Sequence, residues 1–137
     1  MMTLSLLLAA SAAPAQGPSC PPEVVEAERI YSGVFVDDFE SQQFFEGAKG
    51  VADIDRRARP RTWADFDVVG FGHPFDVTRR EPGIAYHVRF VGVKRSRGVA
   101  GIPCGYGHMN SSDAAMRVVR LLAIERLGRS TIASKPS

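Results

Sequence analysis

The fold class is decided by the stretch from Ile84 to Ser96, IAYHVRFVGVKRS. In its first half, apolar Tyr86, Val88 and Phe90 alternate with polar residues, which is the period of a β-strand with one buried face. After Gly92 the alternation changes phase, and basic residues follow. A glycine at such a phase change is typical of a bulge or a bend, so the stretch predicts a strand that turns round the corner of a barrel.

Two further strands are predicted upstream. Residues 30–38, IYSGVFVDD, carry β-branched and aromatic residues at alternating positions, and Gly33 inside this run is a second candidate bulge. A shorter strand, Gln42 to Glu46, ends at Gly47. Short alternating runs of this kind indicate a small, mainly β domain.

The remaining connections carry weaker signals. Residues 48–61 are polar and highly charged, and they predict either a one- or two-turn helix or an exposed loop that stops at Pro60. Apolar character returns over residues 63–71, which we interpret as a packing segment over the barrel. Residues 98–107 contain four glycines and Pro103, and they predict a loop before the last element.

The last element, Ala114 to Leu127, can be interpreted in two ways. Asp113 is a good helix N-cap, Gly128 is a good helix stop, and the alanine, leucine and arginine content favours a helix. A strand would instead place one set of apolar residues on a single face: Met116, Val118, Leu122 and Ile124. Propensity alone favours the helix.

Four segments resemble a group of small, uncharacterised secreted bacterial proteins. They are Tyr31-Ser-Gly-Val-Phe-Val-Asp-Asp-Phe-Glu, His87-Val-Arg-Phe-Val-Gly-Val, Gly105-Tyr-Gly-His-Met-Asn and Met116-Arg-Val-Val-Arg-Leu-Leu. The resemblance implies that the last segment is a strand that closes the domain. The expected fold is therefore a small OB-like five-stranded barrel, mainly β, with one short helix or packing segment. Asn110 stands where a glycine is usual in that group, and the group brings no established activity.

The chain begins with a predicted secretory signal over residues 1–15. The apolar run Leu4 to Ala13 is about half as long as the roughly 20 residues that a membrane-spanning helix needs. Ala13-Pro14-Ala15 is a small-x-small cleavage site, although no basic residue precedes the apolar run. We expect a linker over residues 16–22, the barrel over 23–128 and a flexible tail over 129–137. No stable membrane span is expected, and the predicted location is periplasmic or secreted.

The two cysteines, Cys20 and Cys104, predict a disulfide, since an even cysteine count in an exported protein usually means pairing. Such a bond would tie the mature N-terminus to the loop before the last element. A lipid anchor at Cys20 is the alternative, although Gly17-Pro18-Ser19 lacks the leucine that usually stands three residues before a lipid-modified cysteine.

The charge distribution is uneven along the chain. The whole sequence has 17 basic and 15 acidic residues, but the acidic ones dominate residues 23–55 and the basic ones dominate residues 56–137. This pattern can indicate a surface that binds anions or nucleic acid. We expect instead that the two parts neutralise each other across the fold, and nucleic acid is not an expected partner, because it requires a strongly positive face.

Catalytic motifs are not indicated by the three histidines, His73, His87 and His108. None belongs to the paired His-x-Ser/Thr units of phosphoesterases. His73 and Asp76 are three residues apart, but the spacing places no further metal ligand beside them. No cofactor and no metal site is expected. A structural role is predicted for His108 and its neighbours Gly105 and Gly107, which would fix the turn before the last element. A small secreted hydrolase that uses one of the three histidines remains the alternative.

A basic face is the remaining candidate site. Four residues near the end of the clearest strand could form it: Arg89, Lys94, Arg95 and Arg97. OB-type folds bind oligonucleotides or oligosaccharides on such a face. Tyr86 and Phe90 lie on the same run but alternate with Arg89, so we expect their rings in the core. The predicted function is a non-catalytic binding or interaction module of the cell envelope, whose partner is an envelope protein or an anionic ligand.

Overall fold

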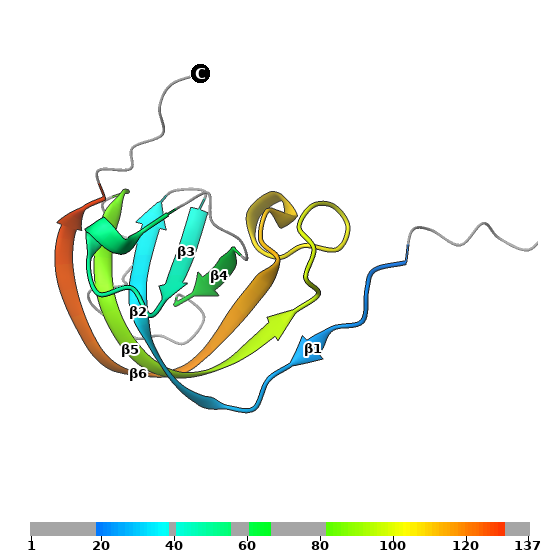
Figure 1. The fold of residues 1–137 in the computed structure, drawn as a ribbon, viewed down its shortest axis with the longest axis horizontal. Helices are drawn as coiled ribbons and strands as arrows, with labels where there is room; N and C mark the ends of the chain where they lie inside the picture. The colour runs from blue at the N-terminus through cyan, green and yellow to red at the C-terminus, as the bar shows by residue number, and fades with distance from the viewer. Residues whose placement is uncertain (1–18, 39–40, 56–60, 67–81, 131–137) are drawn as a thin grey trace, which may run out of the picture.

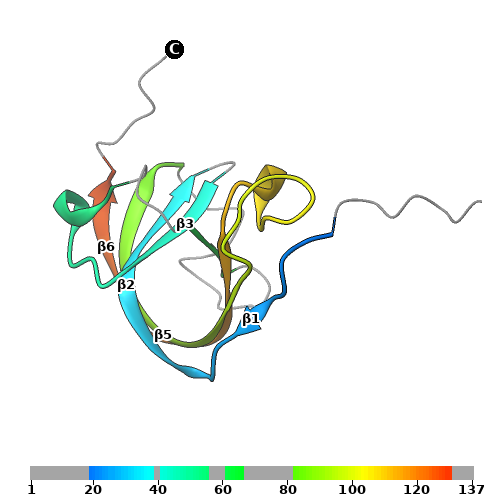
Figure 2. The same ribbon diagram turned by 45° about the vertical axis from the view of Figure 1, so that its right-hand side comes forward.

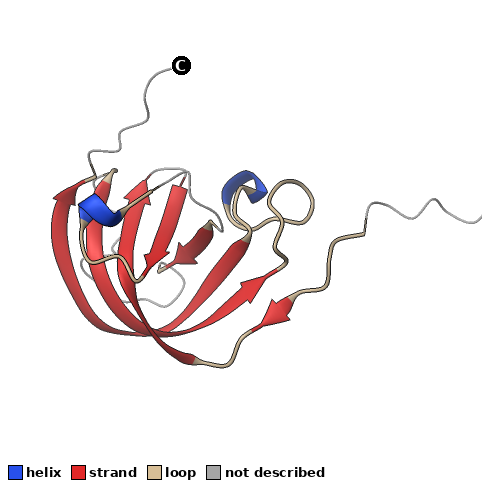
Figure 3. Cartoon of the chain, in the orientation of Figure 1, coloured by secondary structure: helices blue, strands red, loops and turns tan. Residues whose placement is uncertain are grey.

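The structure is a computed structural model that describes residues 19–38, 41–55, 61–66 and 82–130. The predicted signal and His73 therefore lie outside the described residues. The described chain forms a closed, mixed β-barrel of five strands, with one extra strand (Figure 1). The strands are β1 (Val24–Val25), β2 (Arg29–Asp38), β3 (Ser41–Glu46), β4 (Thr62–Asp65), β5 (Ile84–Ser96) and β6 (Ala114–Arg129). The described helical turns are two short 3-10 segments, η1 (Val51–Asp53) and η3 (His108–Asn110) (Figure 3).

The barrel closes in the order β2-β3-β4-β6-β5, after which β5 returns to β2. All of these pairs are antiparallel except β4 with β6, which run parallel. β1 continues along the edge of β5 beyond the end of β2 (Figure 2). The small OB-like five-stranded barrel expected from the resemblance is confirmed. Among the described residues, no helix has the length and apolarity needed to cross a membrane.

The clearest predicted strand has the bounds of β5, and the strand interpretation of the last element is confirmed by β6. Helix propensity fails there because β6 pairs with β5 along its whole length, and this pairing outweighs the local preference. The prediction of a packing segment is wrong for residues 62–65. They form β4, a barrel strand whose Thr62 and Ala64 are buried, and four residues are too few for their alternation to stand out.

The barrel interior is filled by aromatic rings. Phe66 lies between Phe35, with ring centroids 4.7 Å apart, and Phe90, at 5.3 Å. Phe44 meets Phe90 edge-on at 5.1 Å. Phe90 and Tyr86 are buried, as expected from their alternation with Arg89. Contacts of this geometry stabilise the core beyond simple burial, because ring edges and faces carry opposite partial charges.

Glycines allow the strands to bend as tightly as the barrel requires. A side chain at Gly33 would collide with the carbonyl oxygen of Phe45 on β3. A Cβ at Gly92 would lie 2.9 Å from the carbonyl oxygen of Arg117 on β6, and the β5–β6 register shifts between Val91 and Gly92. The bend predicted at Gly92 is confirmed, and its cause is the close approach of the neighbouring strand.

The predicted disulfide between Cys20 and Cys104 is confirmed. It joins the segment before β1 to the loop of residues 97–113 that connects β5 with β6, and Figure 1 shows both at the same side of the barrel. The bond spans 84 residues of sequence, so it removes much of the freedom of the unfolded chain.

Removing this bond in the variant Cys20→Ser/Cys104→Ser should lower the free energy of unfolding by about 2–5 kcal/mol, because the unfolded chain regains that freedom. Urea denaturation followed by circular dichroism measures the change. Dithiothreitol should reproduce it in the wild-type protein and leave the variant unaffected. Equal urea midpoints for the variant and the oxidised wild type would contradict a stabilising role.

Candidate ligand-binding groove

A groove of about 540 Å³ lies on the outer face of the barrel, where β4, β6 and β5 are neighbours and the β5–β6 loop passes beside them. Side chains from four segments form it. They are Trp63 and Asp65 of β4, Arg95 of β5, Arg117 of β6, and Tyr106 of the loop, with the backbone of Gly107.

The strand register brings these residues together. Trp63 is paired with Ala115 across the parallel β4–β6 ladder, and Ala115 is paired with Arg95 across the antiparallel β5–β6 ladder. Residues paired in this way project to the same face of a sheet. The small side chain of Ala115 therefore stands between two large ones, and the groove deepens at that position.

The β5–β6 loop is held by its own backbone hydrogen bonds. Tyr106 and Ser112 exchange two of them, at 2.9 and 3.1 Å, and the amide of Gly101 donates to the carbonyl of Asn110 at 2.6 Å. Asn110 has a φ of 52°, in the left-handed region that glycine and asparagine tolerate best. This conformation gives a physical reason for the glycine that the resemblance leads us to expect at position 110.

Gly105 and Gly107 have no room for side chains. A Cβ at Gly105 would collide with the carbonyl oxygen of Asn110, and a Cβ at Gly107 would enter the indole ring of Trp63. Gly107 also has a φ of +72°, which disfavours any other residue. The loop backbone thus lies directly on part of the indole, while the half-buried Trp63 also lines the groove.

Tyr106 connects the loop to the N-terminal segment. It is 8% exposed, and its hydroxyl donates a hydrogen bond of 2.7 Å to Oε2 of Glu23. Burial raises the pKa of Tyr106 above its ordinary value, and the hydrogen bond to Glu23 raises it further. The guanidinium carbons of Arg97 and Arg95 lie 5.2 and 5.8 Å from the ring centroid, within the range of cation–π attraction.

Two guanidinium groups of the groove have no acidic partner among the described residues. Within the described part of the chain, neither Arg95 nor Arg117 forms an ion pair or a side-chain hydrogen bond. Arg97 differs, because it pairs with Glu23 at 3.4 Å and donates to the carbonyl of Cys104 at 3.5 Å. The described lining contains one carboxylate, Asp65. The groove therefore combines aromatic surface with positive charge that the described residues do not neutralise, a combination suited to an anion.

The four residues of the predicted basic face do not form one surface. Arg95 lines the groove and Arg97 lies next to it, but Lys94 forms an ion pair of 3.7 Å with Glu46 outside the groove. Arg89 is exposed on β5, six residues before Arg95 and opposite Ser32 of β2. Adjacent residues of a strand face opposite sides, which separates Lys94 from Arg95.

The two histidines in the described part of the chain, His87 and His108, are not brought together. His87 lies near the start of β5, opposite Val34 and Glu125, whereas His108 is exposed in η3. Nine residues of β5, about 30 Å of extended chain, separate His87 from the start of the loop that carries His108. Among the described residues, no group of three potential metal ligands lies close together.

Sequence reasoning missed Trp63, Asp65, Tyr106 and Arg117. Tyr106 belongs to the Gly-Tyr-Gly-His motif, which gave a signal for the loop but not for a binding role. Trp63 and Arg117 lie close together only because β4 pairs in parallel with β6, and no local sequence pattern predicts this pairing. No family model, curated protein or solved structure matches the chain significantly. Function is therefore inferred from the geometry of the groove.

Replacing Tyr106 with phenylalanine should lower the free energy of unfolding at pH 7 by about 1–2 kcal/mol, because the hydrogen bond to Glu23 is lost. The pKa of Tyr106 is higher in the folded state than in the unfolded chain, where it is about 10. The hydroxyl therefore makes its full contribution to the free energy of unfolding below about pH 10, and this contribution is lost as the pH rises through the pKa of the folded state. The stability of Tyr106→Phe should therefore fall less steeply above pH 10 than that of the wild type.

Urea unfolding at pH 7 and above pH 10 measures both effects. The control is Tyr31→Phe, which removes a tyrosine whose pKa burial also raises but keeps Tyr106. Parallel stability profiles of Tyr106→Phe and wild type above pH 10 would count against the contribution assigned to this hydroxyl.

Proposed function

We propose that the protein is an exported, non-catalytic binding module of the cell envelope that takes an acidic oligosaccharide in the groove. The observation that carries this proposal is the pair of guanidinium groups without a described partner, Arg95 and Arg117, beside Trp63. The OB-type barrel supports it, because barrels of this kind bind oligosaccharides and oligonucleotides on the face of their second and third strands and at the loops that follow the first and fourth strands. The β5–β6 loop, which borders the groove, has the position of the second of these loops.

The groove suits a sugar acid in two respects. The guanidinium groups of Arg95 and Arg117 offer planar donors that match a carboxylate or sulfate. Trp63 offers a rigid aromatic surface on which the apolar face of a sugar ring can lie, and the loop backbone on Gly107 holds the indole in position. Little rearrangement would be needed on binding, which favours affinity.

An oligonucleotide fits less well. Nucleic-acid binding without sequence preference depends on many phosphate contacts along a positive groove. The whole chain has a formal net charge of only +2, and Lys94 and Arg97 are engaged with Glu46 and Glu23. A hydrolase is disfavoured by the separation of His87 from His108.

Export is part of the proposal. The disulfide between Cys20 and Cys104 fits an oxidising compartment, where such bonds persist. The predicted signal over residues 1–15 would deliver the chain there, to the periplasm or the exterior. An acidic glycan of the envelope or its surroundings would then be accessible.

The single tryptophan makes binding directly measurable, since Trp63 is the only one in the chain. Uronic-acid oligosaccharides should change its fluorescence in a saturable manner, and affinity should fall as salt increases. Arg95→Gln and Arg117→Gln should each weaken binding about tenfold or more, because each removes a charge-assisted hydrogen bond.

Arg89→Gln is the matched control, because it removes the same charge from an exposed position of the same strand outside the groove. It should leave affinity nearly unchanged. An equal loss in Arg89→Gln, or equal binding of neutral glucose oligomers, would contradict the proposed site. Tighter binding of an oligonucleotide of equal charge would contradict the assigned ligand class.

A further inference from the structure

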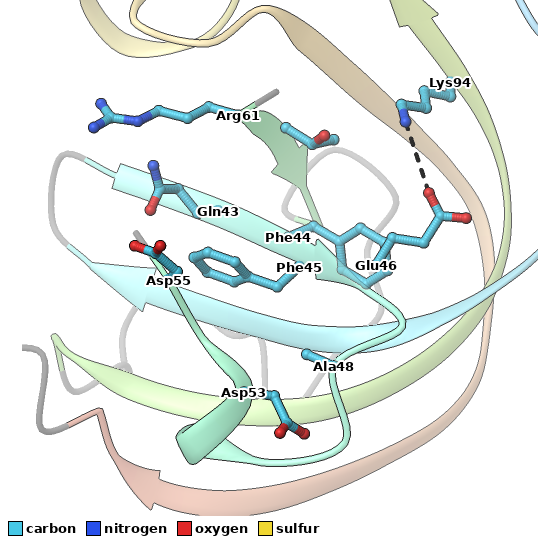
Figure 4. A pocket seen from close by; sticks show the side chains of 10 residues that line it. Gln43, Phe44, Phe45, Glu46, Ala48, Asp53, Asp55, Arg61 and Lys94 are labelled. Atoms are coloured by element: carbon cyan, nitrogen blue, oxygen red, sulfur yellow. Dashed lines mark ion pairs between the residues drawn. The ribbon is translucent and has the colours of Figure 1, made fainter. Parts of the chain in front are cut away.

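A second hollow, of about 350 Å³, lies between β3, β4 and the segment of residues 48–55 (Figure 4). It exists because β3 and β4 pair only at two positions, Gln43 with Trp63 and Phe44 with Thr62. Beyond these pairs the strands separate, and Phe45 and Arg61 line the resulting space. Residues of the segment 48–55, which includes η1, form the outer wall.

The backbone of Arg61 is firmly held at the junction of β4 and β6. Its amide donates to Oδ2 of Asp113 at 3.3 Å. Its carbonyl accepts hydrogen bonds from the amides of Asp113 and Ala114, at 3.0 and 3.1 Å. The side chain extends from this fixed point and lines the hollow together with Gln43 (Figure 4).

The guanidinium group of Arg61 has no acidic partner in the described part of the chain. Its Nε is buried and makes no hydrogen bond, and the side chain forms no ion pair with any residue that the structure describes. A buried donor without an acceptor costs about 1–3 kcal/mol, and more when it belongs to a charged group. Such exceptions are rare in folded proteins and commonly mark the position of a bound water, ion or ligand.

Two carboxylates that line the hollow are already engaged elsewhere. Glu46 accepts from Arg29 at 2.9 Å and pairs with Lys94 at 3.7 Å. Oδ2 of Asp53 accepts hydrogen bonds from the backbone amides of residues 49 and 50, at 2.9 and 3.1 Å. Figure 4 shows its carboxylate directed away from Arg61. The third carboxylate, Asp55, forms no ion pair with Arg61 and lies at the exposed rim.

We infer that this hollow is a second binding site, in which Arg61 holds the carboxylate or phosphate group of a small anionic ligand. The two terminal nitrogens of the guanidinium group would donate hydrogen bonds to the anion, and the side chain of Gln43 lines the same hollow. The ring of Phe45, half-buried in the same wall, provides apolar surface for the body of the ligand. The site is separate from the groove and does not depend on the function proposed for it.

The Nε–Hε signal of Arg61 in a ¹⁵N NMR spectrum tests this site directly. Titration with acetate or inorganic phosphate should shift the Arg61 signal in a saturable manner, while the signals of exposed arginines should move only slightly and linearly. Phosphate should also raise the melting temperature of the wild type, because binding favours the folded state. Arg61→Gln should reduce this rise, because only the contribution of the second site is lost, and Arg61→Lys should weaken phosphate binding at this site at least tenfold while keeping the charge.

Two control variants separate this proposal from the function of the groove. Arg89→Gln removes an exposed charge outside both sites and should leave the rise in melting temperature intact, while Arg117→Gln in the groove should leave the saturable shift of the Arg61 signal unchanged. Circular dichroism shows whether each variant is folded. The NMR titration of the wild-type protein tests the site even if Arg61→Gln does not fold. The second site is refuted if the Arg61 signal does not saturate or moves no more than the other arginine signals. It is also refuted if phosphate stabilisation disappears in Arg117→Gln but persists in Arg61→Gln, which would place the anion in the groove.

Discussion

The parallel pairing of β4 with β6 holds the barrel closed, and both candidate sites depend on it. β6 is paired along one edge with β5 and, over its first four residues, along the other edge with β4. This double pairing seals the aromatic interior, because Phe66 follows directly after β4 and packs on Phe35 and Phe90. It also sets Trp63 beside Ala115 on the outer face, which creates the groove, and it anchors the backbone of Arg61 at the edge of the second hollow.

The β5–β6 loop turns this closed barrel into a shaped surface. Gly105 and Gly107 let the loop backbone contact itself and the indole of Trp63, while the bond from Cys104 to Cys20 ties the loop to the N-terminal segment. Tyr106 adds a second connection to that segment through Glu23. A loop fixed in so many ways presents its groove in one conformation, and a preorganised site loses little entropy when a ligand binds.

The sequence predicted the fold better than the site. Alternation identified β2, β3 and β5, and the resemblance resolved β6 as a strand against its helical propensity. β4 was missed because a four-residue strand carries too little pattern, and its two partners lie far away in the sequence. Of the four residues of the predicted basic face, Arg95 lines the groove. The pleat of β5 directs Lys94 to the opposite side of the strand, where it pairs with Glu46. Arg61 could not be singled out, because its lack of an acidic partner appears only in three dimensions.

The most direct test of this account is the proximity of β4 and β6 in solution, measured by nuclear Overhauser effects between backbone protons. The parallel register predicts contacts between Trp63 and Ala115 and between Asp65 and Arg117, together with cross-strand contacts from β6 to β5. Short amide–amide contacts between successive residues from Ala114 to Leu127, without contacts to β4, would instead indicate a helix. That result would open the barrel, remove the floor of the groove and contradict the account.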